Sequence, residues 1–216
     1  LDAKYPMGGE KQTVRAAVGR TIPDGGGLPL DVGVVVINVS TCVGLAGAVL
    51  RDRPFTHRVV SVTGPGVVTP KNLLAPVGAS VADLLAACGG LTPTAARLIA
   101  GGPMMGFALG SAQVPVTKGT SGITVLTSAE LAQEQRSACI RCGRCVEVCP
   151  LDLVPARIAL ASRLENWDLA RRHHILSCME CGCCAYVCPA GIPLVQLIRQ
   201  GKSRLPREVK NEVKRA

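Results

Sequence analysis

Aromatic side chains are almost absent from this sequence of 216 residues, because Phe, Trp and Tyr together make up only 2% of it. A hydrophobic core must therefore be built from small aliphatic residues, and a chain of this length can still bury one. The formal net charge is +9, yet no aromatic residues are interleaved with the basic ones and no nucleic-acid-binding motif accompanies them. We therefore expect no nucleic-acid partner.

Uninterrupted apolar segments are missing as well. Two stretches, 32–50 and 98–117, carry no charge and are long enough to cross a bilayer. Each contains several glycines together with prolines or polar residues, which break helices and would leave polar groups unsatisfied in lipid. We expect no transmembrane helix in either. The sequence opens at Leu1 with neither a charged segment nor an apolar signal region, and we interpret it as a fragment that lacks the N-terminal part of its first domain.

Cysteine, in contrast, is abundant. Nine of the eleven cysteines lie in two short runs, 139–150 and 178–189. Both runs fit the pattern C-x2-C-x2-C-x3-C-P, which is the spacing of bacterial two-cluster ferredoxins. The pattern predicts metal-cluster ligands in a reducing compartment rather than disulfide bonds. Cys183 is surplus to the second run, and we interpret it as a non-ligand beside the cluster.

The spacing predicts two [4Fe–4S] clusters, because soft thiolates match iron and sulfide. Three cysteines of each run wrap one cluster, whereas the fourth begins after a turn of helix and points toward the other cluster. Gly143 and Gly182 keep the loops slim, so that backbone N–H groups can approach the sulfurs. The predicted ligands are Cys139, Cys142, Cys145 and Cys188 for the first cluster, and Cys178, Cys181, Cys184 and Cys149 for the second.

A zinc-binding structural module is the alternative from a different class. Four-cysteine zinc sites are usually built from two C-x2-C pairs. Here each run supplies four cysteines and a trailing proline, which favours the iron–sulfur interpretation.

The sequence outside the two cysteine runs predicts short helices and strands. Helices are expected at 12–18, 41–50, 80–88, 155–164 and 169–176. Strands are expected at 32–37, 58–63, 71–77 and 123–127, the first of them fully buried. Ser80 with Asp83 forms an N-terminal helix cap. Cys42 and Cys88 lie in apolar helices and are expected to be buried thiols.

Basic residues follow one another near the end of the sequence. We expect a solvated helix and tail there, with contact to anionic lipid headgroups or to an acidic partner as the alternative. These residues are Arg199, Lys202, Arg204, Arg207, Lys210, Lys214 and Arg215.

Several segments resemble the RnfC family, the C subunits of Rnf electron transport complexes, over nearly the whole chain to about Lys202. They are 4–12, 27–29, 31–35, 38–39, 101–106, 117–122 and 139–145. The resemblance implies an α+β multidomain fold in three parts. Residues 1–50 would be the C-terminal part of an α/β flavin- and NADH-binding domain similar to that of respiratory complex I. Residues 51–127 would form a β-grasp soluble-ligand-binding module, and 128–203 an α-helical two-cluster ferredoxin domain, followed by a basic tail at 204–216.

The resemblance also implies a function. The chain would belong to an electron-transfer subunit of a membrane-associated NADH:ferredoxin oxidoreductase that couples electron flow to Na+ or H+ translocation. The implied cofactors are two [4Fe–4S] clusters, with FMN and NADH in the full-length protein. The implied partners are ferredoxin, integral membrane subunits and a ferredoxin-like subunit of the complex, at the cytoplasmic face of the bacterial inner membrane. The fragment alone is not expected to be active, and a cobalamin reductase of a diol-utilisation microcompartment is the alternative with the same architecture.

The resemblance places a flavin site on two stretches. By position, its residues are Tyr5, Gly8, Gly9, Glu10, Asn38 and Thr41. Gly8 and Gly9 would let backbone N–H groups approach a phosphate or a flavin ring, and an ordinary turn is the other interpretation of these glycines. The sequence departs from the family pattern at Gly9, Ile37 and Ser40, and the glycine-rich phosphate loop that opens such domains is not in the chain.

Overall fold

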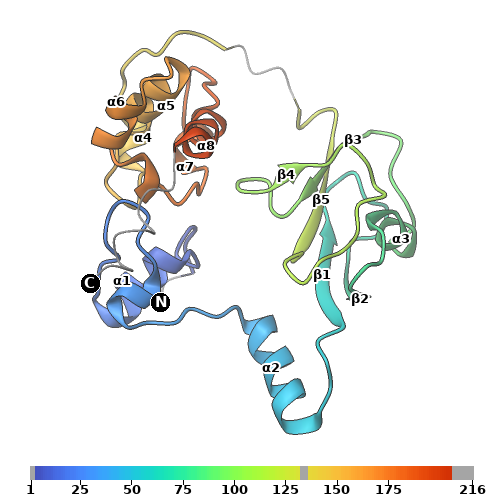
Figure 1. Ribbon diagram of the computed structural model, residues 1–216. Coiled ribbons are helices and arrows are strands. Elements are labelled where there is room, and N and C mark those ends of the chain that lie inside the picture. The colour runs from blue at the N-terminus through green and yellow to red at the C-terminus, as the bar shows by residue number, and fades with distance from the viewer. Residues whose placement is uncertain (1–2, 132–135, 206–216) are drawn as a thin grey trace. The chain divides into compact units, whose positions relative to one another are not determined.

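The computed structural model describes residues 3–131 and 136–205, and they form two compact units (Figure 1). One unit combines residues 1–36 with 134–216, and the other spans 37–133. The predicted first domain, 1–50, is thus divided between the two units, and its first part packs with the cysteine-rich region. The basic tail predicted at 204–216 lies outside the described residues from position 206 onward.

The unit of residues 37–133 is built on a mixed five-stranded sheet. Its strand order is β2-β1-β5-β3-β4, with β1 parallel to β5 and every other neighbouring pair antiparallel. Val60 and Val62 of β1 and Ile123 and Val125 of β5 are buried, whereas Val59 is half exposed. The strands are β1 (His57–Thr63), β2 (Lys71–Pro76), β3 (Ala95–Ala100), β4 (Phe107–Ala108) and β5 (Gly122–Thr127). Three of them confirm predicted strands, while β3 and β4 lie in a passage without strand periodicity.

Helix α3 (Val81–Ala87) completes the core of this unit. Its buried Leu84 and Leu85 join the valines of β1 in one cluster. Ser80 caps the helix as predicted, because its hydroxyl accepts from the Asp83 N–H and the Asp83 carboxylate accepts from the Ser80 N–H, both at 3.1 Å. Cys88, directly after the helix, is fully buried as predicted.

Helix α2 (Val39–Arg51) confirms a predicted helix, but its environment differs from the prediction. Asn38 caps it by accepting from the Ser40 N–H at 3.0 Å. None of its residues is buried, so Cys42 is exposed and the prediction of a buried thiol there was wrong. A helix buries an apolar face only against a second apolar surface, and the Phe55 ring, which lies against Gly44 of α2, leaves the apolar residues of this helix exposed or only partly buried.

The predicted buried strand at 32–37 is also wrong. The chain forms a 3-10 helix, η1 (Pro29–Val32), followed by an irregular segment in which Val35 is 66% and Ile37 45% exposed. A strand needs a neighbour for its backbone N–H and C=O groups, and no described segment pairs with this one. The described part of residues 1–50 therefore contains helices α1 (Glu10–Val18), η1 and α2, and no flavin-binding α/β domain.

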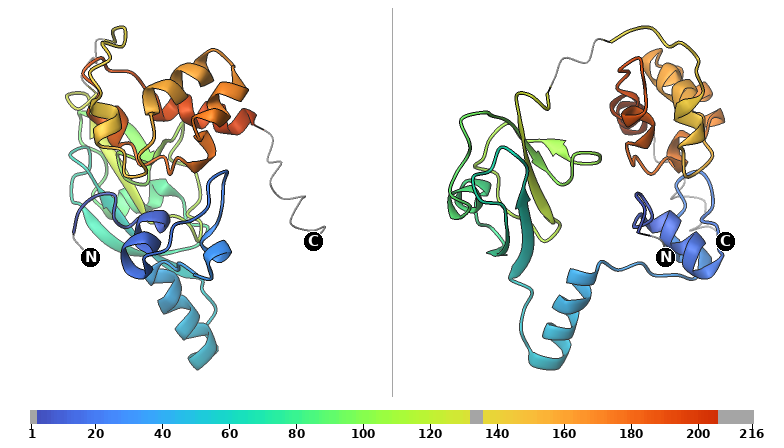
Figure 2. Two further views of the ribbon diagram at one scale, coloured as in Figure 1. Left: turned by 90° about the vertical axis from the view of Figure 1, so that its left-hand side faces the viewer. Right: turned by 180° about the vertical axis from the view of Figure 1, so that it is seen from behind.

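The cysteine-rich region is helical, as predicted (Figure 2). Its two longest helices, α5 and α8, pack against each other, with Ile158, Ile175 and Ile198 fully buried in the shared core. The helices are α4 (Arg144–Glu147), α5 (Pro155–Arg163), α6 (Trp167–Arg172), η2 (Ile175–Ser177), α7 (Cys183–Tyr186) and α8 (Leu194–Arg204). The helix expected at 169–176 is replaced by α6 and the separate turn η2.

The two cysteine runs belong to a structural repeat of 39 residues. Helix α4 corresponds to α7 and α5 to α8 at this offset. Three pairs of equivalent residues share a positive φ. They are Arg141 (56°) with Glu180 (59°), Gly143 (82°) with Gly182 (89°), and Asp152 (53°) with Gly191 (59°). The repeat therefore extends from the cysteine loops into the helices that follow them.

No helix among residues 3–131 and 136–205 combines the length and the apolar character that a membrane crossing requires.

The turn after β1 provides a test of the sheet unit. Gly64 has a φ of 107°, and a Cβ atom there would lie 2.2 Å from the carbonyl oxygen of Val125. Gly78 has a similar φ of 100° but open space around it. Both Gly64→Ala and Gly78→Ala should destabilise the unit through the positive φ. Gly64→Ala should cost about 2 kcal/mol more, since the backbone of β5 must move.

Chemical denaturation followed by circular dichroism measures this difference. Equal losses of unfolding free energy for the two variants would contradict the close packing of the turn against β5.

Candidate iron–sulfur centres

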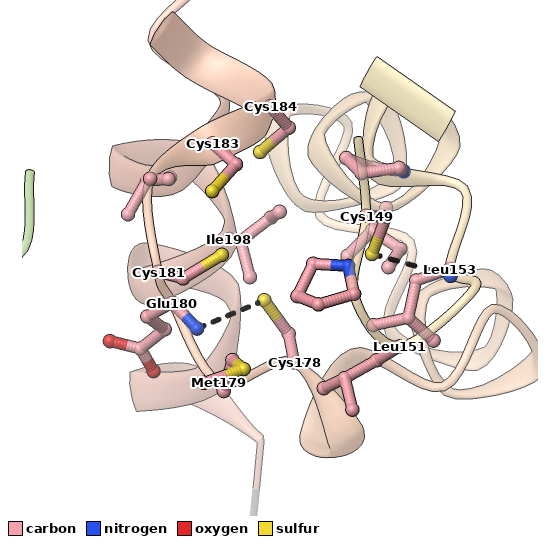
Figure 3. Close-up of a pocket in the computed structure, with 15 residues that line it drawn as sticks. Cys149, Leu151, Leu153, Cys178, Met179, Glu180, Cys181, Cys183, Cys184 and Ile198 are labelled. Atoms are coloured by element: carbon pink, nitrogen blue, oxygen red, sulfur yellow. Dashed lines mark hydrogen bonds between the residues drawn. The ribbon is translucent and has the colours of Figure 1, made fainter. Parts of the chain in front are cut away.

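Cysteines from both runs meet around one pocket in the helical unit. The pocket is lined by Cys178, Cys181 and Cys184 of the second run and by Cys149 of the first, and their sulfur atoms face a common space (Figure 3). Apolar side chains of α5 and α8, including Ile158 and Ile198, also line it. The structure thus brings together the four cysteines that the sequence predicted for the second cluster.

The loop of the second run turns its thiols inward through two left-handed residues. Glu180 has a φ of 59° and Gly182 a φ of 89°. The Glu180 N–H then donates to the Cys178 sulfur at 3.4 Å, and the Leu153 N–H donates to the Cys149 sulfur at 3.4 Å (Figure 3). Hydrogen bonds to sulfur favour the thiolate, which is the form that binds metal.

Burial and mutual proximity work against free thiolates in this pocket. Burial raises the pKa of Cys178, which the Glu180 N–H and the charge of Lys202 partly offset. Burial, followed by the nearby Cys178 and Cys181, raises the pKa of Cys184 to about 12. Four soft donors around one apolar pocket fit an iron–sulfur cluster, because the metal compensates the charge that water would otherwise have to solvate.

In a [4Fe–4S] cluster, each of the four cysteines binds a different iron. The cysteines therefore lie farther apart than the ligands of a single metal ion. Within the described part of the chain, no three His, Cys, Asp or Glu side chains lie close enough to hold one metal ion.

The first run forms a more exposed site. Burial raises the pKa of Cys145, and nearby Cys139 and Cys142 add to this effect. Cys139 and Cys142 are exposed. The Ser137 N–H donates to the Ala190 carbonyl at 3.0 Å, so the start of this run lies beside the end of the second run, where Cys188 is located.

Cys183 lies beside the second set. Its side chain also lines the pocket, next to Cys181 (Figure 3). Burial and the neighbouring Cys181 raise its pKa to about 11. Its role as a non-ligand stays a prediction.

The N-terminal stretch predicted to bind flavin packs on the second cysteine run. The Tyr5 hydroxyl donates to the Cys181 carbonyl, and burial, together with Cys181 and Cys183, raises the Tyr5 pKa and keeps this donor protonated. Gly9 lies against the Met179 side chain, whereas Gly8 has open space beside it. These contacts join residues far apart in the sequence, and no sequence pattern indicates them.

Two further contacts fasten the first helix, which begins at Glu10, to the cysteine region. Lys11 Nζ donates to the Ser177 carbonyl at 3.0 Å, and Gln12 Nε2 donates to the Pro150 carbonyl at 2.6 Å. The other predicted flavin residues, Asn38 and Thr41, lie at the start of α2 in the second unit. The two predicted stretches thus belong to different units, and their joint role in a flavin site stays a prediction.

Sequence reasoning missed a charged group beside the second site. The carboxylate of Glu180 accepts from Arg199 Nε at 2.8 Å and from Lys202 Nζ at 2.7 Å. Lys202 Nζ also donates to the Cys178 carbonyl at 2.7 Å. Arg199 and Lys202 belong to the basic run that is expected to be solvated, and only their spacing of three residues on one helix could have indicated a shared face.

Comparison with known protein families covers both units. Residues 59–108 match the SLBB domain and residues 135–192 match the 4Fe-4S dicluster domain. The second match confirms the prediction of two [4Fe–4S] clusters and favours it over a zinc module, while the assignment of individual ligands stays a prediction.

Curated relatives align with nearly the whole chain. It is 44% identical over 204 residues to the C subunit of the proton-translocating ferredoxin:NAD(+) oxidoreductase complex of Clostridium ljungdahlii. It is 44% identical over 207 residues to the C subunit of the ion-translocating oxidoreductase complex of Rhodobacter capsulatus. The chain is a homologue of these RnfC-type proteins. A third relative, the C subunit of the Na(+)-translocating ferredoxin:NAD(+) oxidoreductase complex of Acetobacterium woodii, is 42% identical over 202 residues.

The alignments differ in how much of each protein they cover. They include 94%, 95% and 94% of this chain but only 44%, 39% and 45% of the three relatives. The chain thus spans less than half the length of these three relatives.

Replacement of one ligand tests the second site. Cys181→Ala should remove the electron paramagnetic resonance signal of one reduced cluster and leave the other, because only one site loses a thiolate. Cys183→Ala is the matched control, and it should leave both signals in place. Loss of a cluster in Cys183→Ala, or two unchanged signals in Cys181→Ala, would contradict the assignment.

Proposed function

We propose that this chain is part of an electron-transfer subunit of a membrane-associated NADH:ferredoxin oxidoreductase that couples electron flow to Na+ or H+ translocation. The observation that carries the proposal is the meeting of Cys149 with Cys178, Cys181 and Cys184 around one apolar pocket. It occurs within the segment that matches a 4Fe-4S dicluster domain. The names of the relatives supply the reaction, since they describe subunits of ion-translocating ferredoxin:NAD(+) oxidoreductases.

The arrangement of the cysteines suits a relay of single electrons. Bound [4Fe–4S] clusters would supply one-electron chemistry, and the protein sets their spacing and their access to partners. Exchange of the fourth ligand between the runs would hold the two sites close together. Residues of α5 and α8 line the second site, whereas the exposed Cys139 and Cys142 leave the first site accessible to a redox partner.

FMN and NADH belong to the proposal for the whole protein. Tyr5, Gly8, Gly9 and Glu10, with Asn38 and Thr41, would contribute to the flavin site. The open space beside Gly8 supports this assignment, as does the direct contact of Tyr5 with the second cysteine run.

The sheet unit would serve as a β-grasp module. Support for this comes from its mixed sheet, which shares a core with helix α3, and from the SLBB match. The proposed partners are integral membrane subunits, a ferredoxin-like subunit and ferredoxin, at the cytoplasmic face of the bacterial inner membrane. The relatives favour this complex over a cobalamin reductase.

Metal analysis of the full-length protein, purified without oxygen, tests the proposal. We expect about eight iron and about eight acid-labile sulfide per chain, together with co-purification of integral membrane subunits. Stoichiometric zinc without sulfide, or a colourless protein that resists reconstitution, would contradict it.

A further inference from the structure

Glu180, Arg199 and Lys202 form a charged cluster, which we call the Glu180 triad. The Glu180 carboxylate lies 2.8 Å from Arg199 Nε and 2.7 Å from Lys202 Nζ. The three side chains are 25%, 19% and 23% exposed, respectively. Charges that are this shielded are screened by salt far less than charges in open solvent.

The triad adjoins the second cysteine site directly. Glu180 stands between Cys178 and Cys181 in the loop, with its N–H directed at the Cys178 sulfur and its carboxylate pointing away from it (Figure 3). Lys202 Nζ donates both to that carboxylate and to the Cys178 carbonyl, at 2.7 Å in each case. The ammonium group is therefore fixed beside Cys178.

The contact with the Cys178 carbonyl places the positive charge of Lys202 next to a predicted ligand of the second cluster. A cation held beside the site stabilises any further negative charge that the site takes up.

The structural repeat provides an internal comparison. The positions 39 residues before Glu180, Arg199 and Lys202 hold Arg141, Leu160 and Arg163. No acidic residue stands at these equivalent positions, and Arg141 and Arg163 are both exposed. The first site thus has the same backbone as the second but lacks the equivalent of the triad.

We propose that Lys202, held in place by Glu180, is a positioning residue that raises the reduction potential of the second cluster. Reduction adds one negative charge to a cluster, and a fixed, weakly screened cation favours the reduced form. Nearby charge, hydrogen bonding and solvent exposure are the means by which a protein sets cluster potentials. The inference rests on the proposed function only in requiring that both clusters are bound.

The test is a redox titration of the cluster-loaded, full-length protein, followed by electron paramagnetic resonance. Cys181→Ala assigns the signal of the second cluster. In Lys202→Met, the equilibrium constant for reduction of the second cluster should fall about tenfold, or about 59 mV for one electron. The first cluster should be unchanged. Lys202→Arg keeps the charge and should restore most of the wild-type potential.

Arg163→Met is the matched control, since it removes a cation from the equivalent, exposed position of the repeat. It should shift neither cluster. An unchanged second-cluster potential in Lys202→Met, or an equal shift in Arg163→Met, would overturn the inference.

Variant proteins must be shown to hold both clusters before titration. If Lys202→Met loses the second cluster, Lys202→Gln is titrated in its place and should show the same fall. Loss of the second cluster from both neutral variants would also overturn the inference, because Lys202 would then be needed for assembly. A wild-type protein without iron and sulfide would instead overturn the proposed function.

Discussion

The meeting of Cys149 with three cysteines of the second run is the constraint on which the helical unit depends. Cys149 can reach Cys178, Cys181 and Cys184 only if the two loops face each other. The duplicated backbone provides this, because left-handed residues at equivalent positions turn both loops. The packing of α5 against α8, with Ile158 and Ile198 buried between them, then holds the two halves together. Two clusters that each take cysteines from both runs would therefore link the two halves of the helical unit.

Backbone symmetry and side-chain asymmetry have different consequences in this unit. The repeat gives both sites the same loop geometry, so each can present three thiols in one direction. Equivalent positions, however, carry Glu180 in one half and Arg141 in the other, and Lys202 is shielded where Arg163 is exposed. The two halves of the repeat thus share a backbone but place different charged side chains around their cysteine sites. A chain of two inequivalent clusters is suited to directing electrons rather than only storing them.

Sequence features predicted the structure correctly where residues close together in the sequence determine it. The cysteine spacing indicated the cluster region, and Ser80 with Asp83 indicated the start of α3. Predictions failed where the outcome depends on distant partners. The β-branched segment 32–37 forms no strand without a neighbour, and Cys42 is exposed because no residue of α2 is buried by the described part of the chain. The contacts of Tyr5 and Lys202 with the second run are tertiary, so no local pattern contains them.

The crossed ligation itself is tested most directly by Cys149→Ala. This residue belongs to the first run in sequence but lines the pocket of the second. Electron paramagnetic resonance of the reduced, full-length variant should show loss of the cluster held by Cys178, Cys181 and Cys184, with the other cluster intact. If the signal that disappears is instead the one lost on replacement of Cys142, each run would hold its own cluster, and the exchange of ligands between the runs would be contradicted.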